Sequence, residues 1–255
     1  MKIRMLLALL LGFNLALAAA GCGGDDDDGA ATDADTDADT DADTDSDTDT
    51  GLDISVCAPE NGPFSLEIDN PFFPLPVGHA LVLEGDDDGA LLRVEFTVLD
   101  ETEEVAGVTT RVIEEVEYED DVLVEISRNF FVQAPDGTVC YYGEDVDIYD
   151  ETGTEVVAHD GAWRAGVDEA QPGIQMPAEP EVGMEYDQEY APDVAQDHAE
   201  IVAMGEALSV PAGEFDDTLR TTETSALESG TSLKIYVAGI GMAVDETIEL
   251  IEYTE

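Results

Sequence analysis

The chain has very few basic residues. Its 255 residues include 8 lysines and arginines against 62 aspartates and glutamates, which gives a formal net charge of -54 at pH 7. A surface of this sign repels the phosphates of nucleic acids and the headgroups of anionic lipids. The composition therefore argues against any nucleic-acid partner.

The chain also lacks the motifs of common catalytic chemistry. It contains no G-x-S-x-G nucleophile elbow, no H-E-x-x-H metal motif and no phosphate-binding P-loop. Pairs of carboxylates give no specific signal for a glycosidase, because any fold of so acidic a chain brings some pair of them together. The sequence predicts no catalytic residue and no cofactor, and it favours a protein that is not an enzyme.

Long apolar runs are absent except at the N-terminus. Lys2 and Arg4 precede an uncharged stretch from Met5 to Cys22 that is rich first in leucine and then in alanine. This order is typical of an export signal. Asn14 interrupts the stretch, which makes it a poor membrane-spanning helix, since such a helix needs about 20 apolar residues.

Two processing sites fit the end of this segment. Residues 18–20 are three alanines and match an ordinary cleavage site. Residues 19–22 read AAGC and resemble the bacterial lipobox, although its usual leucine is absent. We expect residues 1–21 to be a lipoprotein signal peptide and Cys22 to carry lipid. The expected location is the outer membrane or the cell surface, with a secreted or periplasmic soluble protein as the alternative.

Residues 22–56 have the composition of a tether. Between residues 25 and 50 the sequence repeats Asp, Thr and Ala and contains no apolar residue larger than alanine. Such a segment cannot offset the entropy of ordering, and its like charges extend it to ~3.1 Å per residue, or ~100 Å in all. The alternating aspartates resemble half of a calcium loop, but its turn glycine and late glutamate are missing. Only weak calcium association is expected there.

From residue 57 to residue 255 the pattern is that of β-structure. Leu92, Val94, Phe96 and Val98 alternate with polar residues, as in a half-buried strand. Turn sequences separate such runs at residues 87–89, 135–137 and 151–153. We predict one all-β domain built on a single antiparallel, strongly curved sheet or half-barrel. The single helical turn expected lies at residues 192–195.

Residues 161–183 interrupt this pattern with an irregular, proline-containing stretch. A loop this long is uncommon in a compact domain unless it covers a core or has a function. One interpretation is a loop that closes the open side of the sheet with Trp163 and Met176. The other is the lip of a pocket for an apolar ligand, lined by Trp163, Met176, Tyr186 and Tyr190.

Three cysteines leave one unpaired in an exported protein. Lipidation of Cys22 removes this difficulty and leaves Cys57 and Cys140. Disulfides persist in the oxidising compartments outside the cytoplasm. We expect a Cys57–Cys140 disulfide, with two buried free thiols as the alternative.

The acidic stretch from Glu144 to Glu151 is the best local candidate for a metal site. Hard cations such as calcium favour several oxygen ligands together, and Asp145, Asp147 and Asp150 could supply them. The alternative is the solvated end of a hairpin, in which these side chains hold no cation.

Several phrases resemble an uncharacterised family of bacterial exported and lipoprotein β-domains. They are NPFFPL at residues 70–75, YGED at 142–145 and WRAGVD at 163–168. VPAGEF at 210–215 is similar to a broader group of periplasmic β-domains of unknown function. The resemblance covers most of residues 64–250. It implies an all-β fold and no established activity.

Three functions remain open from the sequence. The first is a membrane-anchored envelope lipoprotein whose β-domain binds an apolar ligand or a protein partner. The second is a hydrolase that uses Asp145, Asp147 and Asp168 or a divalent cation. The third is a structural spacer at the surface. The oligomeric state is not predicted.

Overall fold

The computed structural model describes residues 51–87, 89–227 and 229–254. The export segment, Cys22 and the acidic repeat lie outside these residues. In the described part of the chain, no helix has the length and apolar character needed to cross a bilayer.

The described chain is almost entirely β-structure. Two short 3-10 helices precede the strands, and they are η1 (Ile54–Cys57) and η2 (Pro59–Asn61). The strands are β1 (Ala80–Asp87), β2 (Ala90–Val105), β3 (Val108–Glu119), β4 (Val122–Gln133), β5 (Val139–Tyr149), β6 (Val156–Ala158), β7 (Trp163–Arg164), β8 (Gln171–Met176), β9 (Glu185–Asp187), β10 (Glu189–Tyr190), β11 (Asp197–Met204), β12 (Leu208–Val210), β13 (Gly213–Phe215), β14 (Thr218–Ser225), β15 (Ser232–Val237), β16 (Gly241–Asp245) and β17 (Ile248–Thr254).

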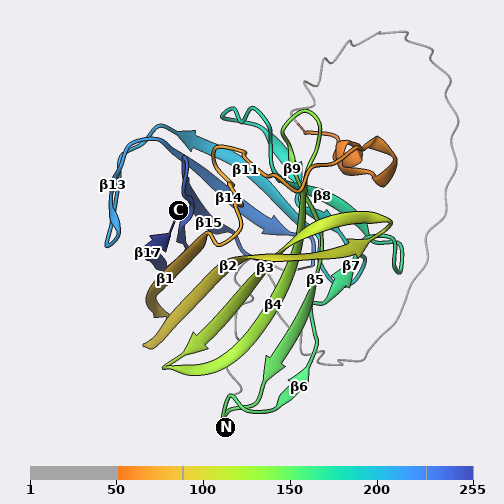
Figure 1. Ribbon diagram of the computed structural model, residues 1–255. Helices are drawn as coiled ribbons and strands as arrows, with labels where there is room; N and C mark the ends of the chain where they lie inside the picture. The colour runs from red at the N-terminus through yellow and green to blue at the C-terminus, as the bar shows by residue number, and fades with distance from the viewer. Residues whose placement is uncertain (1–50, 88, 228, 255) are drawn as a thin grey trace, which may run out of the picture.

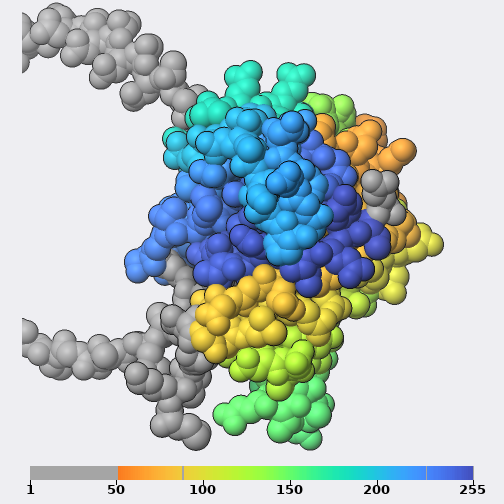
Figure 2. Space-filling view, turned by 90° about the vertical axis from the view of Figure 1, so that its left-hand side faces the viewer, coloured from red at the N-terminus to blue at the C-terminus, as the bar shows by residue number. Residues whose placement is uncertain are grey.

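Fifteen of these strands form one antiparallel sheet that is nearly closed into a barrel (Figure 1). The order across the sheet is β10-β8-β5-β4-β3-β2-β1-β17-β16-β15-β14-β11-β9, and β6 and β7 also pair with β5. The short strands β9 and β10 are consecutive in the chain, so the two ends of the sheet meet there. The β12–β13 hairpin forms a second sheet that lies over the C-terminal strands (Figure 2). The predicted all-β, strongly curved antiparallel sheet is confirmed.

Local sequence explains the strands that were predicted. In β2 the alternating Val94, Phe96 and Val98 are all buried, and Phe96 faces Leu81 across the β1–β2 pair. The three predicted turns join β1 to β2, β4 to β5 and β5 to β6. In the second turn an Asp136 carboxylate oxygen accepts a hydrogen bond of 2.9 Å from the Thr138 N–H.

Two local predictions were wrong. Residues 161–183 are not a structureless loop, because they contain β7 and β8, which pair with the free edge of β5. Residues 192–195 form a turn between the bridged residues Ala191 and Ala195 rather than a helical turn. Pairing with the distant strand β5 decides the first conformation, and the local bridge between Ala191 and Ala195 decides the second.

The contacts of the domain also begin before residue 57. Gly51 forms a parallel bridge with Glu185, and the N–H of Leu52 donates to the Glu185 carbonyl at 2.8 Å. Cys57 is joined to Cys140 on β5 by a disulfide. The end of the predicted tether is therefore attached to the sheet.

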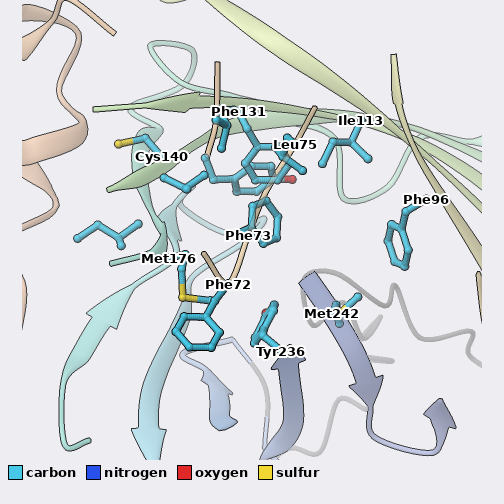
Figure 3. Packing of buried hydrophobic residues seen from close by; sticks show 14 of the residues in the cluster. Phe72, Phe73, Leu75, Phe96, Ile113, Phe131, Cys140, Met176, Tyr236 and Met242 are labelled. Atoms are coloured by element: carbon cyan, nitrogen blue, oxygen red, sulfur yellow. The ribbon is translucent and has the colours of Figure 1, made fainter. Parts of the chain in front are cut away.

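The NPFFPL segment fills one end of the barrel. Figure 1 shows this orange stretch crossing the barrel before it enters β1. Figure 3 shows the ring of Phe73 between Phe131 of β4 and Tyr236 of β15, at centroid distances of 5.3 and 6.4 Å. Asn70 holds the segment in place, because its side-chain amide donates to the Pro177 carbonyl at 2.9 Å.

Candidate functional site

The apolar end of the barrel interior is closely packed. The cavity that remains has a volume of about 30 Å³, which is space for one or two water molecules. Phe73, Leu75, Phe96 and Met242 line it, together with His79, whose Nε2 lies 2.8 Å from the Ile240 carbonyl oxygen. The structure therefore leaves no room for a lipid-sized ligand at this end.

The other end of the interior is strongly polar. Glu115 lies opposite Phe96, and Glu117 lies opposite Val94, so these glutamates share the inward face of the sheet with core residues. The other buried polar residues around them come from seven strands. They are Ser127, Asn129, Glu144, Glu189, Asp197, Thr221, Glu223, Lys234 and Asp245.

Lys234 supplies positive charge to one side of this interior. Its ammonium Nζ lies 2.8 Å from a carboxylate oxygen of Glu223, and both side chains are almost fully buried. Asp245 lies directly opposite Lys234 in the β15–β16 pair. Gln188 and Thr221 each donate to the other Glu223 oxygen at 3.3 Å.

The carboxylates of this group hold Lys234 in its charged form. Burial favours the neutral amine, but Glu223 and Asp245 raise the pKa of Lys234 well above its ordinary value. Burial also raises the pKa of Asp245 to about 7, although Lys234 opposes this rise. The group therefore carries one ammonium and two acids, of which Asp245 titrates near neutral pH.

The facing side of the interior contains acids and neutral polar groups. The Tyr141 hydroxyl donates to Asn129 at 2.9 Å, and the Asn129 amide lies 3.4 Å from a Glu115 oxygen. Glu144 lies opposite Asn129 in the β4–β5 pair. Glu189 accepts a hydrogen bond of 2.8 Å from the backbone N–H of Asp197.

Burial favours the protonated form of three of these acids. The pKa values of Glu115, Glu144 and Glu189 are raised well above the ordinary range. Removal from water is the largest cause for each of them. The strongest added repulsion comes from Glu117 on Glu115 and from Asp197 on Glu189. A neutral carboxyl costs far less to bury than an ionised one.

The four proposed ligand-lining residues do not share a pocket. Trp163, Met176 and Tyr186 are buried in the core, and the Trp163 ring meets Tyr141 edge-on at 5.2 Å. Tyr190 lies on β10 and is 42% exposed. The structure thus places three of them inside the filled barrel and one on its surface.

The acids proposed for a metal site or a hydrolase are separated by other partners. Asp145 forms an ion pair with Arg164, and Asp147 lies 2.9 Å from Nδ1 of His159. Asp150 accepts hydrogen bonds within its own turn, from Thr152 and the Thr154 N–H. Asp168 lies in an exposed turn with a positive φ of 48°. Among the residues that the structure describes, no three His, Cys, Asp or Glu side chains are arranged to hold a metal ion.

A cleft on the outer surface lies beside residues 53–60, near the beginning of the described chain. We call it the junction cleft, and its volume is about 440 Å³. It separates the η1–η2 segment from the turn between β7 and β8. Its lining includes the acids Asp53 and Glu60, the small residues Ala106, Ala165 and Gly166, and also Ile54, Gln171 and Pro172.

The backbone in and beside the junction cleft is unusual. Ala106, which lines the cleft, has a positive φ of 51°, and Asp168 and Glu169, in the turn between β7 and β8, have values of 48° and 67°. Non-glycine residues in this region cost of order 1 kcal/mol or more each, and such residues gather at functional sites. The turn is closed by a hydrogen bond of 2.8 Å from the Gly166 N–H to the Ala170 carbonyl.

Sequence reasoning missed both the buried acids and the junction cleft. The sequence held one signal for the buried acids. Lys234 is the only lysine after Lys2, and it lies in a strand where apolar residues alternate with polar ones. The buried glutamates themselves do not differ in sequence from the many exposed ones.

No protein-family model matches the chain, and neither does any curated protein. Similar solved structures include a "putative exported protein with YmcC-like fold" from Bacteroides fragilis, at 14% identity and a TM-score of 0.32, covering 72% of this chain and 99% of that one. A "putative lipoprotein" from Parabacteroides distasonis shows 16% identity and a TM-score of 0.31, covering 72% and 98%. These names agree with the resemblance seen in the sequence. At such identities and scores they carry no argument about what the domain does.

Proposed function

We propose that the protein is a lipid-anchored envelope protein that presents its β-domain on an acidic tether and binds a partner without catalysing a reaction. The partner contacts the junction cleft rather than the barrel interior. The observation that carries this proposal is the contrast between the two spaces. The apolar interior retains about 30 Å³, whereas the junction cleft measures about 440 Å³, within the range of ligand sites.

The attachment of the tether supports this arrangement. Cys57 is the last residue of η1 and is covalently bound to Cys140 of β5. The Tyr142 hydroxyl donates to the Cys57 carbonyl at 2.6 Å. A pull on the tether is therefore transmitted to the sheet through a disulfide, so one wall of the junction cleft stays in place.

A site-specific photocrosslinker tests the binding surface. Introduced at Gln171, which is exposed in the junction cleft, it is expected to yield a discrete covalent adduct on irradiation of intact cells. The same crosslinker at Glu249, exposed on β17, is the control and is expected to yield none. Equal yields at the two positions, or no adduct at either, would contradict a partner at this cleft.

Removal of the acylated cysteine tests the anchor. The variant Cys22→Ala is expected to leave the membrane fraction and appear in the soluble exported fraction. The reason is that stable attachment requires acyl chains that bury many methylene groups, at about 0.8 kcal/mol for each. The measurement is fractionation with labelled palmitate, and Gly23→Ala serves as the matched control. A Cys22→Ala protein that stays membrane-bound and labelled would refute lipidation at this residue.

A further inference from the structure

The barrel is closed by a very short strand pair. β10 pairs with β8 through Glu189 with Pro172 and Tyr190 with Gln171 only. Proline has no N–H to donate, so this pair is weaker than its length suggests. We call it the closing seam. By contrast, β2 and β3 pair along most of their lengths.

The chain approaches β8 very closely just before the closing seam. A Cβ atom on Gly173 would lie 2.4 Å from the carbonyl oxygen of Gln188. No side chain fits between these backbones, so the kink between β9 and β10 lies directly against β8. This approach brings the buried Glu189 to the edge of the polar interior.

Acids from several strands gather behind the closing seam. Glu189 is repelled by Asp197 of β11, Glu144 of β5 and Glu223 of β14. Oε2 of Glu189 and Oε1 of Gln188 are buried and have no hydrogen-bond partner among the described residues.

Glu144 has its own set of charged and titratable neighbours. They are Glu125 on β4, Asp197 on β11, and Tyr141 and Asp145 on β5. Glu115 of β3 in turn faces Glu144, Glu117, Glu125 and Lys234. Lys234, the one cation in these sets, forms its ion pair with Glu223.

We propose that the closing seam is controlled by protons: it stays paired while Glu144 and Glu189 carry protons, and it opens when both ionise. Glu189 belongs to the seam, and Glu144 of β5 is near enough to repel it. Both side chains are buried while the seam is closed. Opening admits water to both charges. This inference concerns the barrel itself and does not depend on the membrane anchor or on the junction cleft.

The direction of the pH dependence follows from the raised pKa values. An acid whose pKa is raised in the closed state binds more protons there than in the open state. Stability of the closed seam is therefore fully present at a pH below the ordinary range of glutamate. It falls as the pH rises from that range toward the raised pKa values of Glu144 and Glu189.

Hydrogen exchange on the intact domain tests the proposal. Amide protection in β8 and β10 would be measured from pH 5 to pH 8, corrected for intrinsic exchange rates, in 1 M NaCl. At that salt the Debye length is about 3 Å, so repulsion between surface acids is screened while buried groups are little affected. Seam protection is expected to fall at least about tenfold over this range, because the closed seam retains protons that the open seam loses. Protection in β2 and β3 is expected to stay constant.

Trp163 provides a second readout. It is the only tryptophan of the chain, it is 6% exposed, and its ring contacts Tyr141 beside the acids. Acrylamide quenching of its fluorescence is expected to increase over the same pH range. A wild-type seam whose protection and quenching are both constant from pH 5 to pH 8 would overturn the proposal.

Neutral variants identify the groups responsible. In Glu144→Gln/Glu189→Gln the loss of protection between pH 5 and pH 8 is expected to shrink to less than about twofold, because glutamine does not ionise. Glu181→Gln, which removes one exposed acid from the β8–β9 connection, is expected to behave like wild type. A double variant that keeps the full wild-type pH dependence would overturn the assignment. If the double variant does not fold, Glu144→Gln alone is expected to weaken the pH dependence of seam protection. An unchanged pH dependence in this single variant would also overturn the assignment.

Discussion

Replacing Cys57 and Cys140 with alanine is expected to lower the free energy of unfolding by about 4.5 kcal/mol. The two residues are 83 positions apart, so their bond removes much of the conformational entropy of the unfolded chain. Both cysteines are fully buried, and alanine fits these positions without burying a new polar group. For a domain of this size, the expected fall in melting temperature is roughly 9–18 °C.

Denaturant unfolding of the oxidised wild type and the double variant measures this difference. The single variant Cys57→Ala is the control, because it opens the same loop and is expected to match the double variant within about 1 kcal/mol. A double variant that loses less than about 1 kcal/mol would contradict the expectation, since it would mean that the bond constrains the unfolded chain very little.

The variant Lys234→Met is expected to lose about 3–5 kcal/mol of stability. Methionine fills a similar volume, but Glu223 then loses an ammonium at 2.8 Å and Asp245 loses the cation opposite it. Both acids remain buried. Breaking a buried ion pair from one side costs more than the pair itself contributes, because a charge is left without a partner.

The pH dependence of this cost distinguishes charge from packing. With Lys234 present, the pKa of Asp245 is about 7. Without the ammonium of Lys234, Asp245 and Glu223 take up protons more readily. The cost of Lys234→Met is therefore expected to be smaller at pH 5 than at pH 8. Urea unfolding at both values measures it. The triple variant Lys234→Met/Glu223→Gln/Asp245→Asn is expected to recover most of the loss. An equal cost at the two pH values would mean that packing, not charge, accounts for the effect.

The predicted strands were those whose pattern is local. The alternation in β2 and the turns at residues 87–89 and 135–137 are readable because a half-buried strand repeats every two residues. β8 was missed because its sequence, QPGIQM, begins with a proline and a glycine. Both residues weaken a strand prediction, yet Gly173 is required here because the backbone of Gln188 lies against it.

The candidate sites were harder to predict than the fold. Trp163 and Met176 were interpreted either as side chains that close the open side of the sheet or as the lining of a pocket, and both are buried inside the barrel. The acids Asp145, Asp147 and Asp150 are close in sequence, but each has a separate partner. Arg164 and His159, which come from later parts of the chain, pair with Asp145 and Asp147, and the turn takes up the Asp150 carboxylate for its own hydrogen bonds.

The sequence by itself predicted an export segment, an acidic tether that follows Cys22, and a β-domain with two cysteines, and the structure confirms the all-β character of the domain. These properties depend on composition and local periodicity, which need no knowledge of distant contacts. Only the tertiary structure decided which of 62 acids are buried. The meeting of β8 with β10 places Glu189 near Glu144, 45 positions earlier in the chain. Burial and electrostatic repulsion depend on distances in space, and those distances are set when the sheet curves and its two ends meet.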